Sequence, residues 1–558
     1  MIKLIEERVR KIKLSYKILL YIGMSILWSL ANVGYSFGFL TWFALVPMLF
    51  MLRYETIKSA AVYSTLFGFV FYLTNFWWMG VPFVKFFGGN PLTAALGGIL
   101  GFIVVIILSA WHGLSYTVAV FLTKYVSEKK SQMFYAAFPI IMTAADYFFP
   151  KLWHDQIGYS QYIFLGFCQT ADIFGVPIIT LIILFCNVTV LMIVESYLLR
   201  KPMHIPIISF LCVIAVVTVT IVYGNLRLDQ LNTLAGDMPK AKVAVIQGNI
   251  SRANKHKADR NKKTDSIRPN IYTRLTMSIL DQSPDLVVWP ESAMMTKLDA
   301  NLEYFDNIMQ FHGVPLLFGS SAIIYNHSDD KAKSVRYNSL FFVNENARLI
   351  DRYDKMRLIP FAETMPLPGL GQIMQWYGLL PFTEGSSHRI MTAGDIRFSP
   401  NICYEDLMPD LIRRGMNGSP SHKAQKANLI INATNDSWFG STPAARMHLH
   451  ISAFRAIENR RTLVRATCTG YSMVCLPTGQ MIQRTDLDEK AAFVSEVPLS
   501  DENTIYDNGG WVFVYILLFI ALLLPLITLI VRGRRQLLLN KRLREKRHQE
   551  RLFQSWID

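Results

Sequence analysis

The chain has 558 residues, of which 52% are hydrophobic and 17% charged, and its formal net charge is +15. This length allows more than one domain, and so apolar a composition excludes an ordinary soluble enzyme and indicates that part of the chain lies in lipid. The positive charge is concentrated at the two ends: residues 1–17 carry six basic and two acidic side chains, and residues 532–558 carry nine and three. Beside apolar segments, such basic blocks are more typical of the cytoplasmic side of a membrane than of nucleic-acid binding.

Eight apolar runs predict membrane helices, because a helix needs about 20 apolar residues to cross a bilayer. The runs lie near residues 17–34, 37–52, 59–80, 93–123, 133–149, 164–197, 204–224 and 511–531. Since many runs follow the first, we interpret it as a retained helix and not as a cleaved signal peptide. We therefore expect a polytopic α-helical membrane domain of about eight transmembrane helices.

The basic residues between these runs predict the orientation. The even-numbered connections are basic, near residues 53–58, 124–130 and 200–201, whereas the odd-numbered ones are poorer and contribute Lys85 and Lys151. By the positive-inside rule, both termini are then cytoplasmic. The long segment after the seventh run faces the exterior, which in a bacterium with two membranes is the periplasm.

This exterior segment has a different sequence pattern, in which β-rich runs alternate with helix-like stretches such as those at 405–416 and 444–460. The strand-like runs are "KVAVIQ", "DLVVWP", "VPLLFG", "YNSLFFVN", "ARLIDRYD", "FSPNICY", "ANLIINAT" and "LVRATC". Strands buried on both faces and separated by helices predict an α/β domain with covered sheets. The expected organisation is a membrane domain at 1–224, an exterior catalytic domain at 225–510, a transmembrane helix at 511–531 and a basic cytoplasmic tail at 532–558.

Three of these strands end on reactive side chains. "DLVVWPESA" leads into Glu291, "LIDRYDKMRLIPFAE" into Lys355 and then Glu363, and "FSPNICYED" into Cys403. Polar groups held at strand ends beside a rigid sheet are a common way to build a site. No CxxC or HExxH motif occurs, and the pair His448 and His450 lacks a third ligand nearby, so we expect no metal.

Cys403 precedes two acids, Glu405 and Asp406, whose charges should raise the pKa of its thiol and keep it protonated. Lys355 is the candidate cation that offsets them, and Glu291 is the candidate general base for the thiol proton. Lys355 and a backbone N–H would then stabilise a tetrahedral oxyanion, for which one donor is typically worth roughly 3 to 4 kcal/mol. The alternative is structural: solvated Glu and Lys side chains, and a cysteine that acts as a small buried hydrophobe.

The order of these motifs resembles the nitrilase (carbon–nitrogen hydrolase) superfamily, whose fold is an αββα sandwich and whose triad is Glu, Lys and Cys. Seven apolar runs before such a domain and one after it make the chain similar to the apolipoprotein N-acyltransferases of bacterial inner membranes. The resemblance covers nearly the whole chain, through "LTWFALVPML", "IGYSQY", "CQTADIFGV", "VAVIQGNI", "WPESA", "YNSL", "IPFAE", "CYED", "NDSWFG" and "FRAIENRRTLVRAT". It implies Glu291 as base, Lys355 as oxyanion stabiliser and Cys403 as nucleophile, supported by Glu363, Tyr404 and Glu405.

The family reaction transfers an acyl chain from a phospholipid to the N-terminal amine of the diacylglyceryl-cysteine of apolipoproteins, through a cysteine thioester. The resemblance thus implies the bilayer, a phospholipid donor and apolipoprotein acceptors as partners, with no cofactor and no nucleic acid. Extracting long chains from lipid costs about 0.8 kcal/mol per CH₂, so apolar side chains should border an opening toward lipid. The candidates are Trp376, Phe382, Trp438 and Phe439, with core packing as the alternative for each.

Other functions stay open at this point. A membrane-tethered nitrilase-type amidase would share the triad but release free acid. A sensor or scaffold would have lost members of the triad. A transporter would need charged residues within its spans, and the apolar runs contain few, mainly Asp146 and Asp172.

Two segments depart from the family pattern. The basic arm at 252–263 lacks the tryptophan that the family usually carries there. It is either a solvated loop or a contact for anionic headgroups. Cys468 stands in "TCTG", where the family commonly has Asn, and is either a second thiol near the site or a packing residue.

Overall fold

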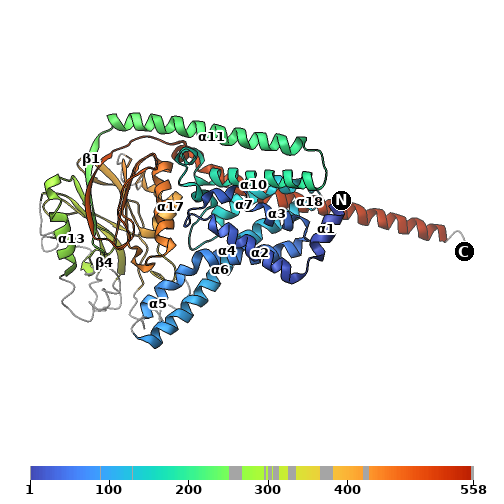
Figure 1. The fold of residues 1–558 in the computed structure, drawn as a ribbon, viewed down its shortest axis with the longest axis horizontal. Helices are drawn as coiled ribbons and strands as arrows, with labels where there is room; N and C mark the ends of the chain where they lie inside the picture. Colours follow the sequence, from blue (N-terminus) through green and yellow to red (C-terminus); the bar gives the residue numbers. More distant parts are fainter. Residues whose placement is uncertain are drawn as a thin grey trace.

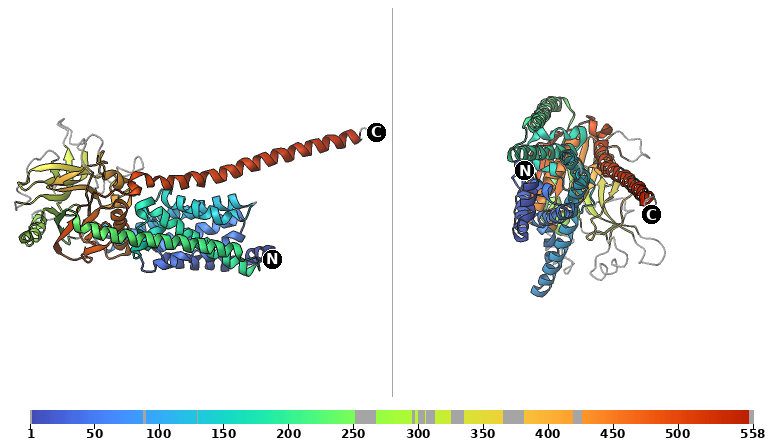
Figure 2. Two further views of the ribbon diagram at one scale, coloured as in Figure 1. Left: turned by 90° about the horizontal axis from the view of Figure 1, so that it is seen from above. Right: turned by 90° about the vertical axis from the view of Figure 1, so that its right-hand side faces the viewer.

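The computed structural model describes residues 2–87, 90–128, 130–250, 267–294, 297–299, 305, 313–324, 335–364, 381–418 and 426–554. These residues form a helical part and an α/β part that lie end to end (Figure 1). Helix α11 (His204–Asp237) runs alongside both parts and leads into the first strand, and helix α18 (Val512–Gln554) extends past the helical part, away from the sheets (Figure 2).

The helical part is built from the N-terminal elements together with the first half of α18. Its other helices are α1 (Ile2–Lys11), α2 (Leu14–Leu30), α3 (Val46–Tyr54), α4 (Ile57–Phe76), α5 (Val81–Phe87), α6 (Pro91–Ser127), α7 (Met133–Phe148), α8 (Leu165–Cys168), α9 (Ala171–Phe174) and α10 (Val176–Leu198). Short 3₁₀ turns lie between them: η1 (Gly38–Trp42), η2 (Trp77–Gly80) and η3 (Ile157–Gln161). Close packing of α4 on α6 depends on glycine, because a Cβ at Gly68 would lie 2.4 Å from the carbonyl oxygen of Gly113.

Five described segments are long and apolar enough to cross a membrane, by length and composition: Ile57–Lys85, Pro91–Ser127, Val176–Leu198, His204–Asp237 and Tyr506–Glu550. Three shorter apolar helices accompany them: Leu14–Leu30, Gly38–Tyr54 and Met133–Phe148. A helical membrane domain with several long apolar helices is therefore confirmed. Of the about eight expected transmembrane helices, five among the described residues are long enough to cross a membrane and three are shorter. Two helices pass the ends expected from hydropathy, since α11 continues beyond residue 224 and α18 continues through the basic tail to Gln554.

The α/β part contains two mixed sheets. The first has the strand order β13-β1-β2-β4-β5-β6, with β3 pairing with β4, and the second has the order β12-β11-β10-β9-β8-β7. The strands of the first sheet are β1 (Lys240–Gln247), β2 (Leu286–Val288), β3 (Lys297–Asp299), β4 (Leu316–Ile324), β5 (Val335–Val343), β6 (Leu349–Asp354) and β13 (Ala491–Pro498). Those of the second are β7 (Met391–Ala393), β8 (Ile396–Ile402), β9 (Leu429–Thr434), β10 (Thr462–Thr467), β11 (Met473–Cys475) and β12 (Met481–Arg484).

The two sheets pack face to face between helices, as the expected αββα sandwich requires. One apolar cluster joins Val243 and Val288 of the first sheet to Phe398 and Val464 of the second. The outer face of the first sheet is covered by α13 (Ile267–Met277), and that of the second by α16 (Pro409–Gly415) and α17 (Pro443–Asn459). Strands buried on both faces explain why their sequences are apolar throughout.

Helix α17 lies between the second sheet and the helical part (Figure 1). Leu449 and Ala453 pack toward the sheet, whereas Met447 and Phe454 belong to the same apolar core as the membrane-type helices. Because both faces of α17 are buried, the helix joins the two parts through continuous packing.

Candidate active site

Glu291 lies just after β2, where the chain leaves the first sheet. Its side chain is buried, and the amide of Asn338 on β5 donates a hydrogen bond of 2.7 Å to Glu291 Oε1. The turn packs tightly on β4, since a Cβ at Gly319 would lie 2.6 Å from the Cα of Glu291. A glycine at position 319 thus allows the carboxylate to sit against the sheet.

Lys355 directly follows β6, and its side chain is fully buried. Its Nζ lies 2.8 Å from Glu363 Oε2 and 3.8 Å from Glu291 Oε1. Asn338 also donates to Glu363 at 2.8 Å, so one amide holds both carboxylates. Burial alone would lower the pKa of Lys355, but Glu363, Glu291 and Cys403 together raise it above its ordinary value, so the lysine is an ammonium.

Cys403 follows β8 and begins the 3₁₀ turn η6 (Cys403–Leu407). Its backbone has a φ of 51°, a left-handed conformation that is uncommon outside glycine, and its side chain is 6% exposed. Burial raises the pKa of its thiol, Glu291 raises it further, and Lys355 lowers it. The structure therefore brings Glu291, the ammonium of Lys355 and the thiol of Cys403 to one buried site.

The two acids after Cys403 are balanced by different groups. Glu405 accepts hydrogen bonds from the Tyr353 hydroxyl and from the backbone N–H groups of Met356, Arg357 and Ile402. Burial nevertheless raises the pKa of Glu405 to about 7, and Lys355 acts against this shift.

Asp406 is balanced by cations other than Lys355. Arg465 Nη1 lies 2.6 Å from Asp406 Oδ2, and His448 Nε2 lies 2.7 Å from Asp406 Oδ1. The expectation that Lys355 offsets both acids thus needs correction for Asp406. Arg465 was not expected at the site, because the sequence marks it only by its position inside the motif "FRAIENRRTLVRAT".

Neither of the two histidines considered as metal ligands lies in a metal cluster. His448 contacts the carboxylates of Asp406 and Asp436, and His450 stacks on Tyr162 with ring centroids 3.4 Å apart. Among the described residues, no group of three or more His, Cys, Asp or Glu side chains is arranged to hold a metal ion.

Tyr404 connects the site to the membrane-type helices. Its hydroxyl donates a hydrogen bond of 2.6 Å to the carbonyl of Leu152, whose own N–H donates to His112 Nε2 at 2.9 Å. Next to Leu152, Lys151 Nζ binds Asp146 at 2.7 Å and Asp155 at 3.3 Å. Tyr404, the residue after Cys403, is therefore hydrogen-bonded to a loop that buried polar groups hold in place.

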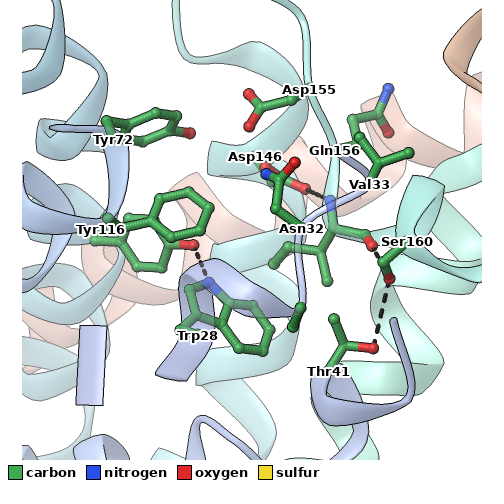
Figure 3. A pocket seen from close by; sticks show the side chains of 13 residues that line it. Trp28, Asn32, Val33, Thr41, Tyr72, Tyr116, Asp146, Asp155, Gln156 and Ser160 are labelled. Atoms are coloured by element: carbon green, nitrogen blue, oxygen red, sulfur yellow. Dashed lines mark hydrogen bonds between the residues drawn. The ribbon is translucent and has the colours of Figure 1, made fainter. Parts of the chain in front are cut away.

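Asp146 and Asp155 also line a cavity of about 20 Å³ within the helical part (Figure 3). The side chains of Asn32, Tyr72 and Ser160 contribute polar groups to it, which suits one buried water molecule. A second cavity, of about 170 Å³, is lined by the same two acids and by Met408 and Asp410 of the α/β part. The other charged residue expected in an apolar run, Asp172, pairs with Arg460 and Arg227.

The candidate access residues differ in their surroundings. Phe382 is half-buried under Arg336, whose guanidinium lies 4.4 Å from the ring centroid. Trp438 and Phe439 are half-buried beside the turn η7 (Asp436–Trp438), and Phe439 packs edge-on against Trp78 with centroids 5.0 Å apart. Trp376 and the basic arm at 252–263 lie outside the described residues.

Cys468 lies near the site but is enclosed. Its side chain is 1% exposed, and its Sγ lies 3.1 Å from the backbone carbonyl of Glu291. The thiol therefore packs behind the candidate base.

Comparisons with known proteins match both parts of the chain. Residues 24–189 match the family model "Apolipoprotein N-acyltransferase N-terminal domain", and residues 242–505 match "Carbon-nitrogen hydrolase". A Geobacter metallireducens protein named apolipoprotein N-acyltransferase is 28% identical over 85% of this chain and 88% of its own length. A Borreliella burgdorferi protein of the same name is 27% identical over 91% of this chain and 94% of its own length.

Solved structures that resemble the chain include an amidase from Nesterenkonia sp. The similarity covers 48% of this chain and 92% of the amidase, with 16% sequence identity and a TM-score of 0.34.

Proposed function

Because the chain belongs to the apolipoprotein N-acyltransferase family, we propose that its lipoprotein N-acylation is catalysed by Glu291, Lys355 and Cys403, with a phospholipid as acyl donor. One observation carries the assignment of these residues. Strand ends from two sheets bring an ammonium, a carboxylate and a thiol to one buried site, where Lys355 Nζ lies 3.8 Å from Glu291 Oε1 and both charges act on Cys403.

In the first half-reaction, Cys403 Sγ attacks the ester carbonyl of the phospholipid while Glu291 takes the thiol proton. The carbonyl oxygen becomes an oxyanion, which the ammonium of Lys355 stabilises. The intermediate collapses as the ester C–O bond breaks, and Glu291 returns the proton to the departing alkoxide. The products are a thioester on Cys403 and a lysophospholipid.

In the second half-reaction, the neutral α-amine of the acceptor attacks the thioester carbonyl and Glu291 removes a proton from the amine. Collapse of the second oxyanion breaks the C–S bond, and the proton on Glu291 passes to the sulfur. The products are an amide and a free Cys403 thiol, so the enzyme is ready for another cycle. A buried site favours this aminolysis because it limits attack by water.

Three neighbours have supporting roles in this proposal. Glu363 holds the ammonium of Lys355 at 2.8 Å, and Glu405 ties the turn at Met356 to the end of β8. Tyr404 holds the Cys403 turn against the carbonyl of Leu152. Phe382, Trp438 and Phe439 stay the access candidates within the described residues. The loop of Trp438 and Phe439 contacts the helices at Trp78.

The chain is a bacterial membrane protein, and we further propose its sidedness. The α/β part at 225–510 lies on the periplasmic face of the inner membrane, after a membrane domain at 1–224, with the helix at 511–531 returning to a cytoplasmic tail at 532–558. The basic ends of the chain support this orientation, since residues 532–558 carry nine basic and three acidic side chains.

The proposal is tested with the purified full-length protein and phospholipid vesicles. Mass spectrometry should detect an acyl thioester on Cys403, which disappears when a diacylglyceryl-cysteine peptide is added and N-acyl peptide forms. Cys403→Ala should form neither product while keeping the thermal midpoint of the parent. Normal transfer by Cys403→Ala would remove the nucleophile assignment, and release of free fatty acid without amide would favour the amidase alternative.

A further inference from the structure

Two carboxylates, one imidazole and one guanidinium form a closed ring behind the Cys403 turn. His448 on α17 lies between Asp406 Oδ1 at 2.7 Å and Asp436 Oδ1 at 2.9 Å. Arg465 on β10 lies between the remaining oxygens, 2.6 Å from Asp406 Oδ2 and 3.1 Å from Asp436 Oδ2. The four side chains are at most 1% exposed.

The geometry of the ring sets the protonation of His448. Carboxylate oxygens accept hydrogen bonds, so both ring nitrogens must donate and the side chain is an imidazolium. Burial and Arg465 act to lower the pKa of His448, but Asp406 and Asp436 outweigh them and raise it. The uncharged ring of Trp153 also lies near His448, with ring centroids 5.6 Å apart.

The ring connects the nucleophile to the loop of the access candidates. Asp406 belongs to the turn that Cys403 begins, and Asp436 begins the turn that carries Trp438. Arg465 also donates a 2.7 Å hydrogen bond to Asn432, whose amide donates to the carbonyl of Cys403 at 3.2 Å. Movement of either turn would therefore break charge-assisted hydrogen bonds inside the protein.

The ring also determines the charge beside the sulfur. Two carboxylates, an imidazolium and a guanidinium sum to zero, whereas a neutral group at position 448 would leave one negative charge. Asp436 already acts on Cys403, since its charge raises the pKa of the thiol. Any negative charge left in the ring would make the thiolate harder to form.

We propose that His448 and Arg465 are positioning residues, which lock the Cys403 turn to the Trp438 turn and cancel the charge of Asp406 and Asp436 beside the nucleophile. The proposal rests on Cys403 as the nucleophile, as proposed above. It assigns a role in the site to residues that do not contact the substrate.

The test measures how fast iodoacetamide alkylates Cys403 in the full-length protein, from pH 6 to pH 10, with mass spectrometry to identify the labelled cysteine. His448→Gln leaves the ring with one net negative charge, so the apparent pKa of the thiol should rise by about one unit and alkylation at pH 7 should slow roughly tenfold. The matched control is His450→Gln, because His450 lies on the same helix and stacks on Tyr162 outside the ring. This control should alkylate at the rate of the parent.

Two further variants distinguish an effect of the ring's net charge on the thiol from a purely structural role of the ring. Asp406→Asn leaves one net positive charge and should shift the thiol pKa in the opposite direction, toward faster alkylation at pH 7. The double variant Asp406→Asn/His448→Gln restores a net charge of zero and should recover most of the rate that His448→Gln loses. If the ring only stabilises the fold, each substitution slows alkylation and the double variant is the slowest.

Slower alkylation in every variant, with the double variant slowest, would overturn the proposal. An unchanged alkylation rate in His448→Gln would overturn it too. Failure of the proposed function gives a different result: the parent and Cys403→Ala would then form the same amount of N-acyl peptide from phospholipid. If His448→Gln does not fold, the opposite shift in Asp406→Asn still decides the question.

Discussion

The ammonium of Lys355 lies 2.8 Å from Glu363 Oε2, closer than it lies to the candidate base Glu291 at 3.8 Å. Glu363 is therefore the main counter-ion of the lysine. Because Glu363 already compensates that charge, Glu291 keeps more of its basicity for the thiol proton. Asn338 bridges the two carboxylates, because its amide donates to Glu291 at 2.7 Å and to Glu363 at 2.8 Å.

Glu363→Gln should slow thioester formation while leaving the fold intact. Without its main counter-ion, the ammonium of Lys355 pairs with Glu291 and makes that carboxylate a weaker base. We expect a loss of roughly 100-fold, or about 2.7 kcal/mol of transition-state stabilisation. Single-turnover acylation by phospholipid measures the rate. Glu384→Gln is the control because Glu384 is exposed, and an equal rate in both variants would contradict the role of Glu363.

Glu405 predicts a pH dependence of stability. Burial raises its pKa from 4.5 to about 7, so between these values the folded protein binds this proton more tightly than the unfolded chain does. The contribution to stability is complete below pH 4.5 and is lost as the pH rises through 7, and its size is about 3 kcal/mol. Thermal midpoints from pH 4.5 to 8 should fall more steeply in the parent than in Glu405→Gln, and parallel curves would exclude the effect.

The sequence predicted the buried strands of the fold better than its short strands and helix boundaries. All eight strand-like runs lie in the two sheets, because strands buried on both faces must be apolar. Short strands such as β12 were missed, since its four residues alternate between half-buried and exposed and carry little apolar signal. The expected helix at 405–416 is divided into η6 and α16, because Pro409 lacks the N–H that a continuous helix would need.

The sequence singles out the candidate reactive residues, but it does not reveal which groups balance the charges around them. Glu291, Lys355 and Cys403 follow strands, so their motifs mark them directly. The partners of Asp406 are His448 and Arg465, which lie 42 and 59 positions away on different elements. Only the packing of α17 and β10 behind the turn brings them together.

Arg460 and Asp172 form a buried pair between the two parts of the protein, with Arg460 Nη2 2.7 Å from Asp172 Oδ2. Asp172→Asn leaves the guanidinium without its counter-ion, and we expect a loss of about 3 to 5 kcal/mol in the free energy of unfolding. Chemical denaturation in detergent measures it. Glu502→Gln is the matched control, since Glu502 pairs with Arg227 at 3.3 Å and is one-third exposed. A loss of the same size in both variants would show that burial of the pair is unimportant.

Tyr404→Phe should affect turnover more than substrate binding. The substitution removes the 2.6 Å hydrogen bond from the Tyr404 hydroxyl to the carbonyl of Leu152. The turn that carries Cys403 then loses this contact with the helical part. A small misplacement of a reacting atom costs rate because near-attack geometry is lost. We expect kcat to fall roughly tenfold with little change in KM, and stability to fall by about 1 kcal/mol.

The control for this variant is Tyr515→Phe. Tyr515 on α18 also donates across the two parts, to Asp410 at 3.2 Å, but it is partly exposed and lies outside the Cys403 turn. Steady-state transfer to a diacylglyceryl-cysteine peptide should therefore proceed at the parental kcat in Tyr515→Phe. If Tyr404→Phe also keeps the parental kcat, or loses affinity instead, the hydroxyl does not position the nucleophile and the Leu152 contact is only part of the packing between the two halves.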